Sequence, residues 1–273
     1  MKTKKPYIIT LLIFLPFLLV LYMLIEPRWI QVVQTDFYDS DIPSAFDGKR
    51  AIFLSDIHVS QFLSRERLQS IVDRVNDMNP DIVFLGGDFI YHGDEFIAPC
   101  FEELGKLRAP LGVYAVTGNH DYWGSHTAVE EAIEREGIEN LNNLGKWVKI
   151  GDQRIRIGGV GDLWEDAPDY KPAIEGSETN DFVVLISHNP DYSETLLENA
   201  IDLQISGHLH GGQITFFGLF APYLPSYYGQ KYRTGLINNG KTTVLVSNGI
   251  GVIGLPFRFG ARPQINVITL RSQ

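Results

Sequence analysis

Residues 51–88 read AIFLSDIHVSQFLSRERLQSIVDRVNDMNPDIVFLGGD, and this stretch repeats one arrangement twice. Each time, a short apolar run rich in branched and aromatic residues, typical of a strand, ends directly in a polar motif: "SDIH" (55–58), then "GGD" (86–88). Between them, Ser64 can cap a helix that runs to about Met78 with its apolar residues on one face. A strand, a helix and a second strand in succession predict an α/β domain.

The same alternation continues outward along the chain. Several apolar runs are continuous, which is typical of strands covered on both faces. The predicted strands are Ala51–Leu54, Ile82–Leu85, Val113–Val116, Ile155–Ile157, Phe182–Ile186, Leu203–Ile205, Thr243–Val246 and Ile265–Leu270, and the further predicted helices are Glu95–Leu107, Thr127–Glu136 and Tyr192–Glu198. No linker is visible after residue 46, so we predict one domain over 50–273 with sheets stacked between helical layers.

The N-terminal region has a different composition. The uncharged run Tyr7–Ile25 would cover roughly 28 Å as a helix, about one hydrocarbon core. We therefore predict a transmembrane anchor over residues 1–28 and a tether over 29–49. A cleaved signal peptide is the alternative, although the run is long for one and no small-x-small cleavage site follows it. Three lysines precede the run and only Arg28 closely follows it, so the charge bias places the domain outside the cell membrane, with a cytoplasmic domain still open.

Charge and cysteine content exclude some classes of function. The formal net charge of the 273 residues is -10, which makes the surface a poor platform for nucleic acid, because such binding depends on neutralising phosphates with Lys and Arg. An acidic chain is instead suited to gathering cations. Cys100 is the single cysteine, so no intramolecular disulfide can form.

Five short polar motifs each follow an apolar run directly. They are "SDIH" (55–58), "GGD" (86–88), "GNHD" (118–121), "SHN" (187–189) and "SGHLH" (206–210), and they contain five of the seven histidines. Any one of them alone is a weak signal, because an Asp after a strand often only caps a helix. Loops beyond the carboxyl ends of neighbouring strands are where open α/β folds assemble their sites, so together the five motifs predict one site.

The side chains in these motifs are typical metal ligands. Carboxylates, an amide oxygen and imidazoles suit Mn, Fe or Zn better than Ca, and the absence of thiolates argues against a structural zinc site. Seven ligands are too many for one ion, but a central carboxylate shared by two ions divides them well. Two ions about 3.5–4 Å apart can hold a bridging hydroxide and polarise a phosphoryl oxygen. The candidate ligands are Asp56, His58, Asp88, Asn119, His188, His208 and His210.

The order D-x-H, G-D, G-N-H-D, H, G-H-x-H resembles the calcineurin-like metallophosphoesterase superfamily from about Arg50 to Leu270. The stretches "GDLW" (161–164), "HNPD" (188–191), "GHLHGGQ" (207–213), "KYRTG" (231–235) and the ending 248–270 look like a bacterial membrane-associated phosphodiesterase subfamily, which is similar to UDP-diacylglucosamine pyrophosphohydrolases. The resemblance implies a four-layer αββα sandwich and a site for two divalent metal ions. Mn is the expected metal, with Zn or Fe as the alternatives.

The resemblance also implies a role for each residue. Asp56, His58 and His210 match the ligands of the first metal, Asn119, His188 and His208 those of the second, and Asp88 the bridging carboxylate. His120 resembles the non-ligand histidine that contacts the substrate phosphate and helps the leaving oxygen depart, and Asp121 would orient its ring. One departure is Tyr91, which stands where the superfamily often has a second Asp; His92 beside it is expected to be a loop residue.

Two apolar stretches bear on the substrate. Residues 214–228 (ITFFGLFAPYLPSYY) directly follow the metal histidines and 251–260 is similar, and each could be core packing or an apolar rim in contact with the membrane. Trp164 could likewise be core or a pocket wall. The candidate phosphate contacts are Lys231, Arg233, Arg258 and Arg262.

These observations predict a membrane-anchored, metal-dependent phosphodiesterase or pyrophosphohydrolase acting on a lipid-linked phosphoester. One alternative is an extracytoplasmic hydrolase of soluble nucleotides or other phosphoesters. The other is a non-catalytic metal-binding module, which should have lost ligands or His120, whereas all of them are present.

Overall fold

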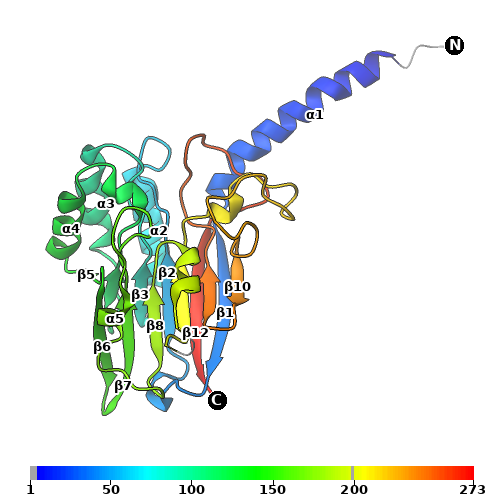
Figure 1. Ribbon diagram of the computed structural model, residues 1–273. Coiled ribbons are helices and arrows are strands. Elements are labelled where there is room, and N and C mark those ends of the chain that lie inside the picture. The colour runs from blue at the N-terminus through cyan, green and yellow to red at the C-terminus, as the bar shows by residue number, and fades with distance from the viewer. Residues whose placement is uncertain (1–4, 198–199) are drawn as a thin grey trace.

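The chain folds around two stacked six-stranded sheets in this computed structural model, which describes residues 5–197 and 200–273, with side chains from residue 14 onward (Figure 1). The first sheet has the order β1 (Gln31–Asp39), β12 (Gln264–Ser272), β2 (Arg50–Leu54), β3 (Ile82–Leu85), β4 (Val113–Ala115) and β5 (Glu139–Asn140). The second has the order β10 (Gly235–Asn238), β11 (Thr243–Val246), β9 (Leu203–Ser206), β8 (Val183–Ile186), β7 (Gln153–Gly159) and β6 (Leu144–Ile150).

Parallel pairing in the middle of each sheet positions the site. In the first sheet β2, β3 and β4 are parallel neighbours, and in the second β7, β8, β9 and β11 are parallel neighbours. Parallel strands end at the same edge, so the loops that follow β2, β3, β4, β8 and β9 lie together. All eight predicted strands are present.

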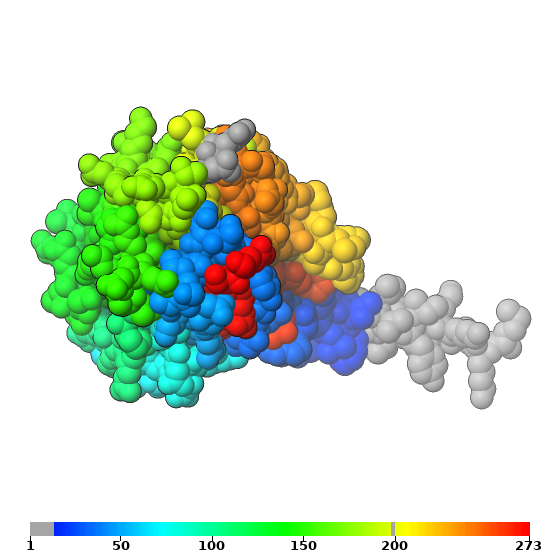
Figure 2. All heavy atoms as spheres, turned by 90° about the horizontal axis from the view of Figure 1, so that it is seen from below, coloured from blue at the N-terminus to red at the C-terminus, as the bar shows by residue number. Residues whose placement is uncertain are grey.

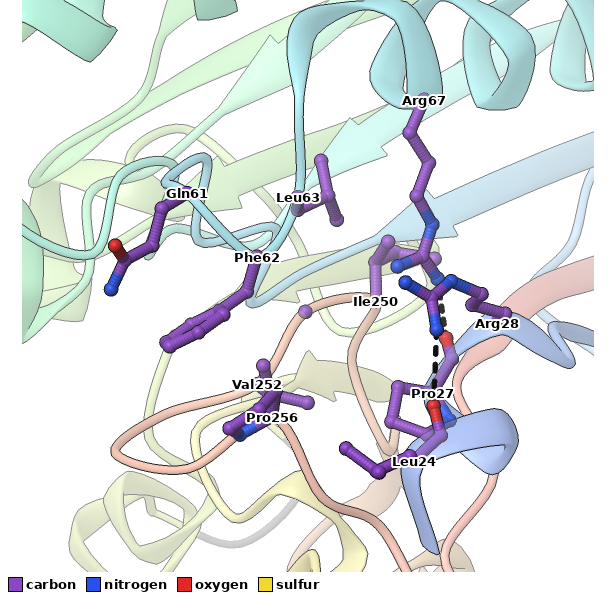
Figure 3. Close-up of a pocket in the computed structure, with 11 residues that line it drawn as sticks. Leu24, Pro27, Arg28, Gln61, Phe62, Leu63, Arg67, Ile250, Val252 and Pro256 are labelled. Carbon is purple, nitrogen blue, oxygen red and sulfur yellow. Dashed lines mark hydrogen bonds between the residues drawn. The ribbon is translucent and has the colours of Figure 1, made fainter. Parts of the chain in front are cut away.

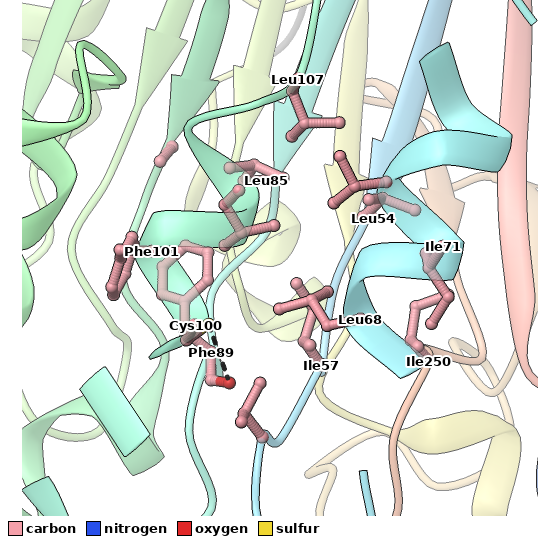
Figure 4. Close-up of a cluster of buried hydrophobic side chains, with 14 of the residues drawn as sticks. Leu54, Ile57, Leu68, Ile71, Leu85, Phe89, Cys100, Phe101, Leu107 and Ile250 are labelled. Carbon is pink, nitrogen blue, oxygen red and sulfur yellow. Dashed lines mark hydrogen bonds between the residues drawn. The ribbon is translucent and has the colours of Figure 1, made fainter. Parts of the chain in front are cut away.

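Helices cover the outer faces of both sheets, which confirms the mixed α/β sandwich. Over the first sheet lie α2 (Arg65–Asp77), α3 (Ile97–Leu104) and α4 (His126–Arg135). Figure 4 shows Leu68 and Ile71 of α2 in the same buried apolar cluster as Leu54, Leu85 and Phe101. The outer layer of the second sheet is thin: the four-residue α5 (Tyr170–Ala173) and the 3-10 helix η5 (Pro190–Thr195) pack there. A second core, with Phe53, Phe84, Phe182 and Ile205, fills the space between the sheets.

The predicted α-helix Tyr192–Glu198 is wrong. A 3-10 helix forms instead over Pro190–Thr195, and the backbone is extended at Leu196, while Glu198 lies outside the described residues. The physical reason is a set of hydrogen bonds made by Asn189 and Asp191. Asn189 caps the turn by accepting the backbone N–H of Asp191 at 3.0 Å, and the Asp191 carboxylate in turn binds the distant Ser226 hydroxyl and the Tyr227 N–H, each at 2.7 Å. These contacts hold the segment in a tight turn.

Residues 29–49, predicted as a tether, contribute a strand to the domain. Strand β1 pairs in parallel with β12 over nine residues and forms an edge of the first sheet. Its one-sided burial, with Phe37 inside and Tyr38 exposed, explains why its sequence looks polar for a strand.

The helix α1 (Lys5–Ile25) precedes this strand and projects from the domain, joined to it by the 3-10 helix η1 (Glu26–Arg28) (Figure 1). Of the predicted anchor over 1–28, residues 1–4 and the side chains of residues 5–13 lie outside the described part of the chain. In the part of the chain that was described, no helix has both the length and the apolar character needed to cross a bilayer.

Candidate metal centre

The five polar motifs meet at one end of the sandwich, between the two sheets. Asp56 and His58 follow β2, Asp88 follows β3 and Asn119 follows β4, while His188 follows β8 and both His208 and His210 follow β9. All seven side chains are buried. Parallel strands that end at the same edge thus bring together residues that are as far apart in the sequence as Asp56 and His210.

These side chains form two clusters of possible ligands. In the first, His210 Nε2 lies 3.1 Å from His58 Nε2 and 3.5 Å from Asp56 Oδ1. In the second, His188 Nε2 lies 3.2 Å from His208 Nδ1 and 3.2 Å from Asp88 Oδ2. The same Asp88 oxygen is 3.4 Å from His58 Nε2. Asp88 therefore stands between the clusters, where a carboxylate shared by two ions would have to be.

The backbone is strained at five of these residues. Asp56, His58, Asp88, His208 and His210 all adopt positive φ angles between 50 and 68°. Residues with a Cβ rarely adopt this conformation, and it persists at functional sites where the surrounding structure enforces it. Here the strain turns several polar side chains toward a common centre.

Two glycines make room for the carboxylates. A Cβ on Gly207 would lie 2.2 Å from Asp56 Oδ2, and one on Gly118 would lie 2.4 Å from Asp88 Oδ1. Only glycine therefore allows these backbone segments to approach the ligands so closely.

The donor set fits divalent cations that accept nitrogen and oxygen ligands. Burial lowers the pKa of His58 and of His208 to about 3, so both imidazoles are neutral at pH 7 and present a lone pair. Asn119 Oδ1 is buried and has no hydrogen-bond partner among the described residues, as expected of an oxygen reserved for an ion. His188 Nδ1 lies 2.8 Å from the Gly86 carbonyl, which leaves Nε2 for the centre.

His120 lies at the edge of the clusters. Its Nδ1 is 3.2 Å from the Tyr91 carbonyl, so Nδ1 carries a proton and Nε2 is the free nitrogen. Its ring centroid is 4.7 Å from that of His58 and 3.9 Å from that of Trp123, and burial lowers its pKa. One His120 nitrogen also falls within the ligand spacing of His58 and Asp88.

Asp121 does not contact the His120 ring, although the sequence suggested that it orients it. Its carboxylate accepts the backbone N–H groups of Asp88, Phe89 and Gly118 at 2.8, 2.9 and 2.9 Å. Burial and then the charge of Asp88 raise its pKa to about 7. Asp121 thus joins the loop of Asp88 to the loop of Asn119, while the Tyr91 carbonyl orients His120.

An apolar cavity of about 540 Å³ opens beside His120. Tyr91, Trp123, Ile214, Tyr223 and Ile253 line it together with His120. The Tyr91 hydroxyl accepts the Gly254 N–H at 3.0 Å, so the residue that replaces the usual Asp ties the 251–260 loop to this wall.

The 214–228 segment is a rim and not core at its aromatic positions. Phe216, Phe217 and Phe220 are 64, 70 and 52% exposed. Trp164 forms a wall of the site, since its ring contacts the His208 ring edge-on, with 4.3 Å between the ring centroids. His92, expected to be a loop residue, has its ring stacked over that of Trp123, with 5.8 Å between the ring centroids.

The four basic residues singled out as phosphate contacts have structural partners. Lys231 pairs with Glu194, and Arg233 donates to the carbonyls of Gly211 and Gly218. Arg258 is fully buried among backbone carbonyls, including that of His210 at 3.3 Å, and Arg262 packs over the Trp29 ring.

Sequence reasoning missed Asp162 as a site residue. Its side chain is buried, Oδ2 has no partner among the described residues, and burial raises its pKa. It interacts electrostatically with His188 and Asp88. The available signal was its place in "GDLW", shortly after β7, because the other site residues also follow strands.

A sequence model of the calcineurin-like phosphoesterase family matches residues 49–212, which include all five motifs. The chain belongs to this family. It is 32% identical over 255 residues to the uncharacterized metallophosphoesterase YkuE of Bacillus subtilis (91% of this chain, 88% of YkuE). It is 31% identical over 257 residues to a zebrafish (Danio rerio) transmembrane protein with a metallophosphoesterase domain (89% of this chain, 57% of that protein). It is 27% identical over 253 residues to the phosphodiesterase YaeI of Escherichia coli (90% of each chain). The chain is thus a metal-dependent phosphoester hydrolase.

Proposed function

We propose that this metallophosphoesterase hydrolyses a phosphodiester or pyrophosphate bond in a lipid-linked substrate at a membrane surface. The observation that carries the proposal is the apolar cavity of about 540 Å³ that opens directly beside His120 and the ligand clusters. A phosphate held at the clusters would place a neighbouring apolar group in that cavity. The likeness of several stretches to UDP-diacylglucosamine pyrophosphohydrolases agrees with such a substrate.

The clusters would hold two divalent ions, and we propose Mn as the preferred metal. Asp56, His58 and His210 would bind one ion, Asn119, His188 and His208 the other, and Asp88 both. When bound, such a pair activates water for attack and stabilises charge on the phosphoryl oxygens. The chain's own part is to fix the ligands on strained backbone and to exclude bulk water by burial.

His120 would act as the general acid. The Tyr91 carbonyl holds its Nδ1–H, so Nε2 is the nitrogen that would take up the second proton of the imidazolium and pass it to the leaving oxygen. The Trp123 ring packed against it at 3.9 Å fixes the ring plane. Asp121 supports the site indirectly, through the backbone of the loops that carry Asp88 and Asn119.

The surface around the cavity supports a membrane as the place of action. The apolar side chains of α1 are largely exposed from Phe14 to Leu21, and α1 meets the 214–228 segment through Phe259, whose ring lies 5.8 Å from Tyr22 and 5.4 Å from Phe217. Figure 2 shows that segment, in yellow, at the same side of the domain as the blue N-terminal region. We propose that residues 1–28 anchor the protein, with the domain on the extracytoplasmic side, in line with the transmembrane naming of the zebrafish relative.

Hydrolysis of soluble nucleotides is the second candidate function. Trp123 and Tyr223 line the cavity and are 51 and 75% exposed, so their rings could stack on a nucleobase.

A substrate series distinguishes the two functions. The full chain in detergent micelles with Mn would be assayed on phosphodiesters and pyrophosphates that differ only in acyl length, on nucleotides, and on a small aryl phosphodiester. A buried methylene contributes about 0.8 kcal/mol, so two of them should raise kcat/KM roughly tenfold. If kcat/KM is independent of acyl length and nucleotides are the better substrates, the lipid proposal is wrong.

A further inference from the structure

A second cavity, of about 210 Å³, lies where α1 joins the domain, apart from the cavity beside His120. Three segments enclose it: the end of α1 with η1, the loop that leads into α2, and the 250–256 loop (Figure 3). Its lining includes Leu24, Phe62, Val252 and Pro256, which are apolar, and two arginines, Arg28 and Arg67.

The two arginines have no acidic partner among the described residues. Arg67 donates to the Pro27 carbonyl and Arg28 to the Leu24 carbonyl at 3.3 Å, and Figure 3 shows both guanidinium groups at the Pro27 side of the cavity. Neither forms an ion pair with a carboxylate in residues 5–197 or 200–273. Burial lowers the pKa of Arg67, and the charge of Arg28 lowers it further. Two neighbouring cations at an apolar surface repel each other, and an anion between them would remove that cost.

The buried carboxylate of Glu26, two residues before Arg28, is used elsewhere. Glu26 is fully buried, and its two oxygens accept the N–H groups of Gly260 and Ala261 at 3.0 and 2.8 Å. It therefore fixes η1 to the 251–261 segment, and its carboxylate is not paired with either arginine. The N-terminus of α2 lies at the cavity, because Leu63 and Arg67, which flank the cap residue Ser64, both line it. The helix dipole therefore adds positive potential there.

We propose that this cavity binds a phosphate group that carries an apolar substituent. Arginine forks match phosphate oxygens in geometry as well as charge, and the apolar lining would cover the first carbons of the substituent. The phosphate could come from a lipid headgroup or from a free phosphate compound. A lipid headgroup fits better, because Leu24 in the lining continues the exposed apolar surface of α1.

The test compares two probes on the full chain in detergent micelles loaded with Mn. The probes are dihexanoyl phosphatidic acid and inorganic phosphate, and binding is measured by calorimetry. Inhibition of aryl phosphodiester hydrolysis is measured in parallel, because it reports probe bound at the metal clusters. Arg28→Gln and Arg67→Gln should each weaken the non-inhibitory binding about tenfold, the scale of one charge-assisted hydrogen bond, and leave the inhibition unchanged.

Arg74→Gln is the matched control, because Arg74 lies on the same helix and donates to the Ile30 carbonyl outside the cavity. It should leave both kinds of binding unchanged. Arg67→Lys keeps the positive charge, so it should retain more of the non-inhibitory binding than Arg67→Gln does. Thermal melting of each variant shows whether it is still folded. Tighter binding of the lipid probe than of inorganic phosphate assigns the site to a lipid headgroup. Equal binding of the two probes would show that the cavity recognises the phosphate alone and would overturn the apolar part of the proposal. Absence of non-inhibitory binding in the wild type, or its persistence in both glutamine variants, would overturn the proposal.

Discussion

His120 differs from the other site histidines because its Nδ1 is held by a backbone carbonyl and it is not needed to complete either cluster. We expect His120→Ala to retain the bound metal and to lower kcat about 10²–10⁴-fold, the usual worth of a general acid. The loss should shrink for aryl leaving groups, because these depart without a proton. Metal analysis and kcat on matched aryl and alkyl diesters check this.

His126→Gln provides the control for that experiment, because His126 faces Thr117 and Tyr122 and belongs to neither ligand cluster. It should leave kcat nearly unchanged. Equal losses for both leaving groups in His120→Ala would remove the acid role, and loss of metal would make His120 a ligand.

Gly207 tests whether close backbone approach builds the centre. A Cβ there would lie 2.2 Å from Asp56 Oδ2, so Gly207→Ala must displace this carboxylate. We expect metal affinity to fall about 10–100-fold, as when groups that support a metal ligand are changed. Gly176→Ala is the control: Gly176 has a φ of +76° but nothing within 4 Å of the added Cβ, so the chain should lose some stability and keep its metal. Normal metal affinity in Gly207→Ala would contradict the account.

At the residue scale the ligand motifs could be predicted, because each has a fixed position after a strand and a side chain with one chemical role. Asp121 shows the limit. Its place next to His120 in the sequence suggested a contact with the ring, but the 3-10 turn Asn119–Tyr122 points its carboxylate at three backbone N–H groups. Sequence adjacency does not fix the direction of a side chain in a tight turn. The Tyr91 carbonyl escaped prediction because any residue could supply it.

At the element scale, prediction succeeded where the segment carries its own signals. Helix α2 begins after Ser64, whose Oγ accepts the Arg67 N–H at 3.4 Å, and buries Leu68, Ile71, Val72 and Val75 as expected. Strand β1 and the turn η5 could not be predicted, because partners far away in the sequence determine them: β12 for the strand, and Ser226 and Tyr227 for the turn. The 214–228 segment was ambiguous, since an apolar sequence alone does not distinguish rim from core.

That segment carries its own prediction. Phe216, Phe217 and Phe220 are more than half exposed, so aspartate at these positions should leave the fold and the turnover of a small aryl phosphodiester nearly unchanged. If the rim contacts acyl chains, each variant should flatten the rise of kcat/KM with acyl length, by up to about 0.8 kcal/mol for each methylene no longer buried. The measurement is kcat/KM across the acyl series.

Leu144→Asp is the matched control for the rim, because Leu144 is 55% exposed but lies on β6 at the far edge of the second sheet. It should keep the acyl-length dependence of the wild type. If the three rim variants keep it as well, the segment does not contact the lipid.

At the scale of the whole molecule, Asp202 should make stability depend on pH. Burial, and then the nearby Asp39 and Asp41, raise its pKa to about 7, against about 3.9 in an unfolded chain. Between these values the folded state binds one proton more than the unfolded state, so the free energy of unfolding falls as pH rises and levels off above about 7. Asp202→Asn keeps an acceptor for the Val183 N–H, which Asp202 binds at 2.7 Å, and removes the titration.

Urea unfolding of both proteins at pH 5, 6, 7 and 8 tests this sign. The stability of Asp202→Asn relative to the wild type should increase with pH up to about 7 and then stay constant. Asp152 lies in an exposed turn, so the free energy of unfolding of the control Asp152→Asn should change with pH in the same way as that of the wild type. A relative stability that decreases with pH would show that Asp202 is ionised in the folded chain.

The central claim is that one buried carboxylate between two histidine clusters organises two metal ions. Asp88 Oδ2 lies 3.4 Å from His58 Nε2 and 3.2 Å from His188 Nε2, so its removal should disturb both clusters at once. The matched variant is His210→Ala, which removes a ligand of the first cluster only.

The decisive measurement is the metal content per chain, by elemental analysis of purified protein, together with hydrolysis of an aryl phosphodiester. We predict about two divalent ions in the wild type, activity that chelation abolishes and Mn restores, one ion retained in His210→Ala, and neither retained in Asp88→Asn. Active protein without bound metal, or two ions retained in Asp88→Asn, would contradict the account.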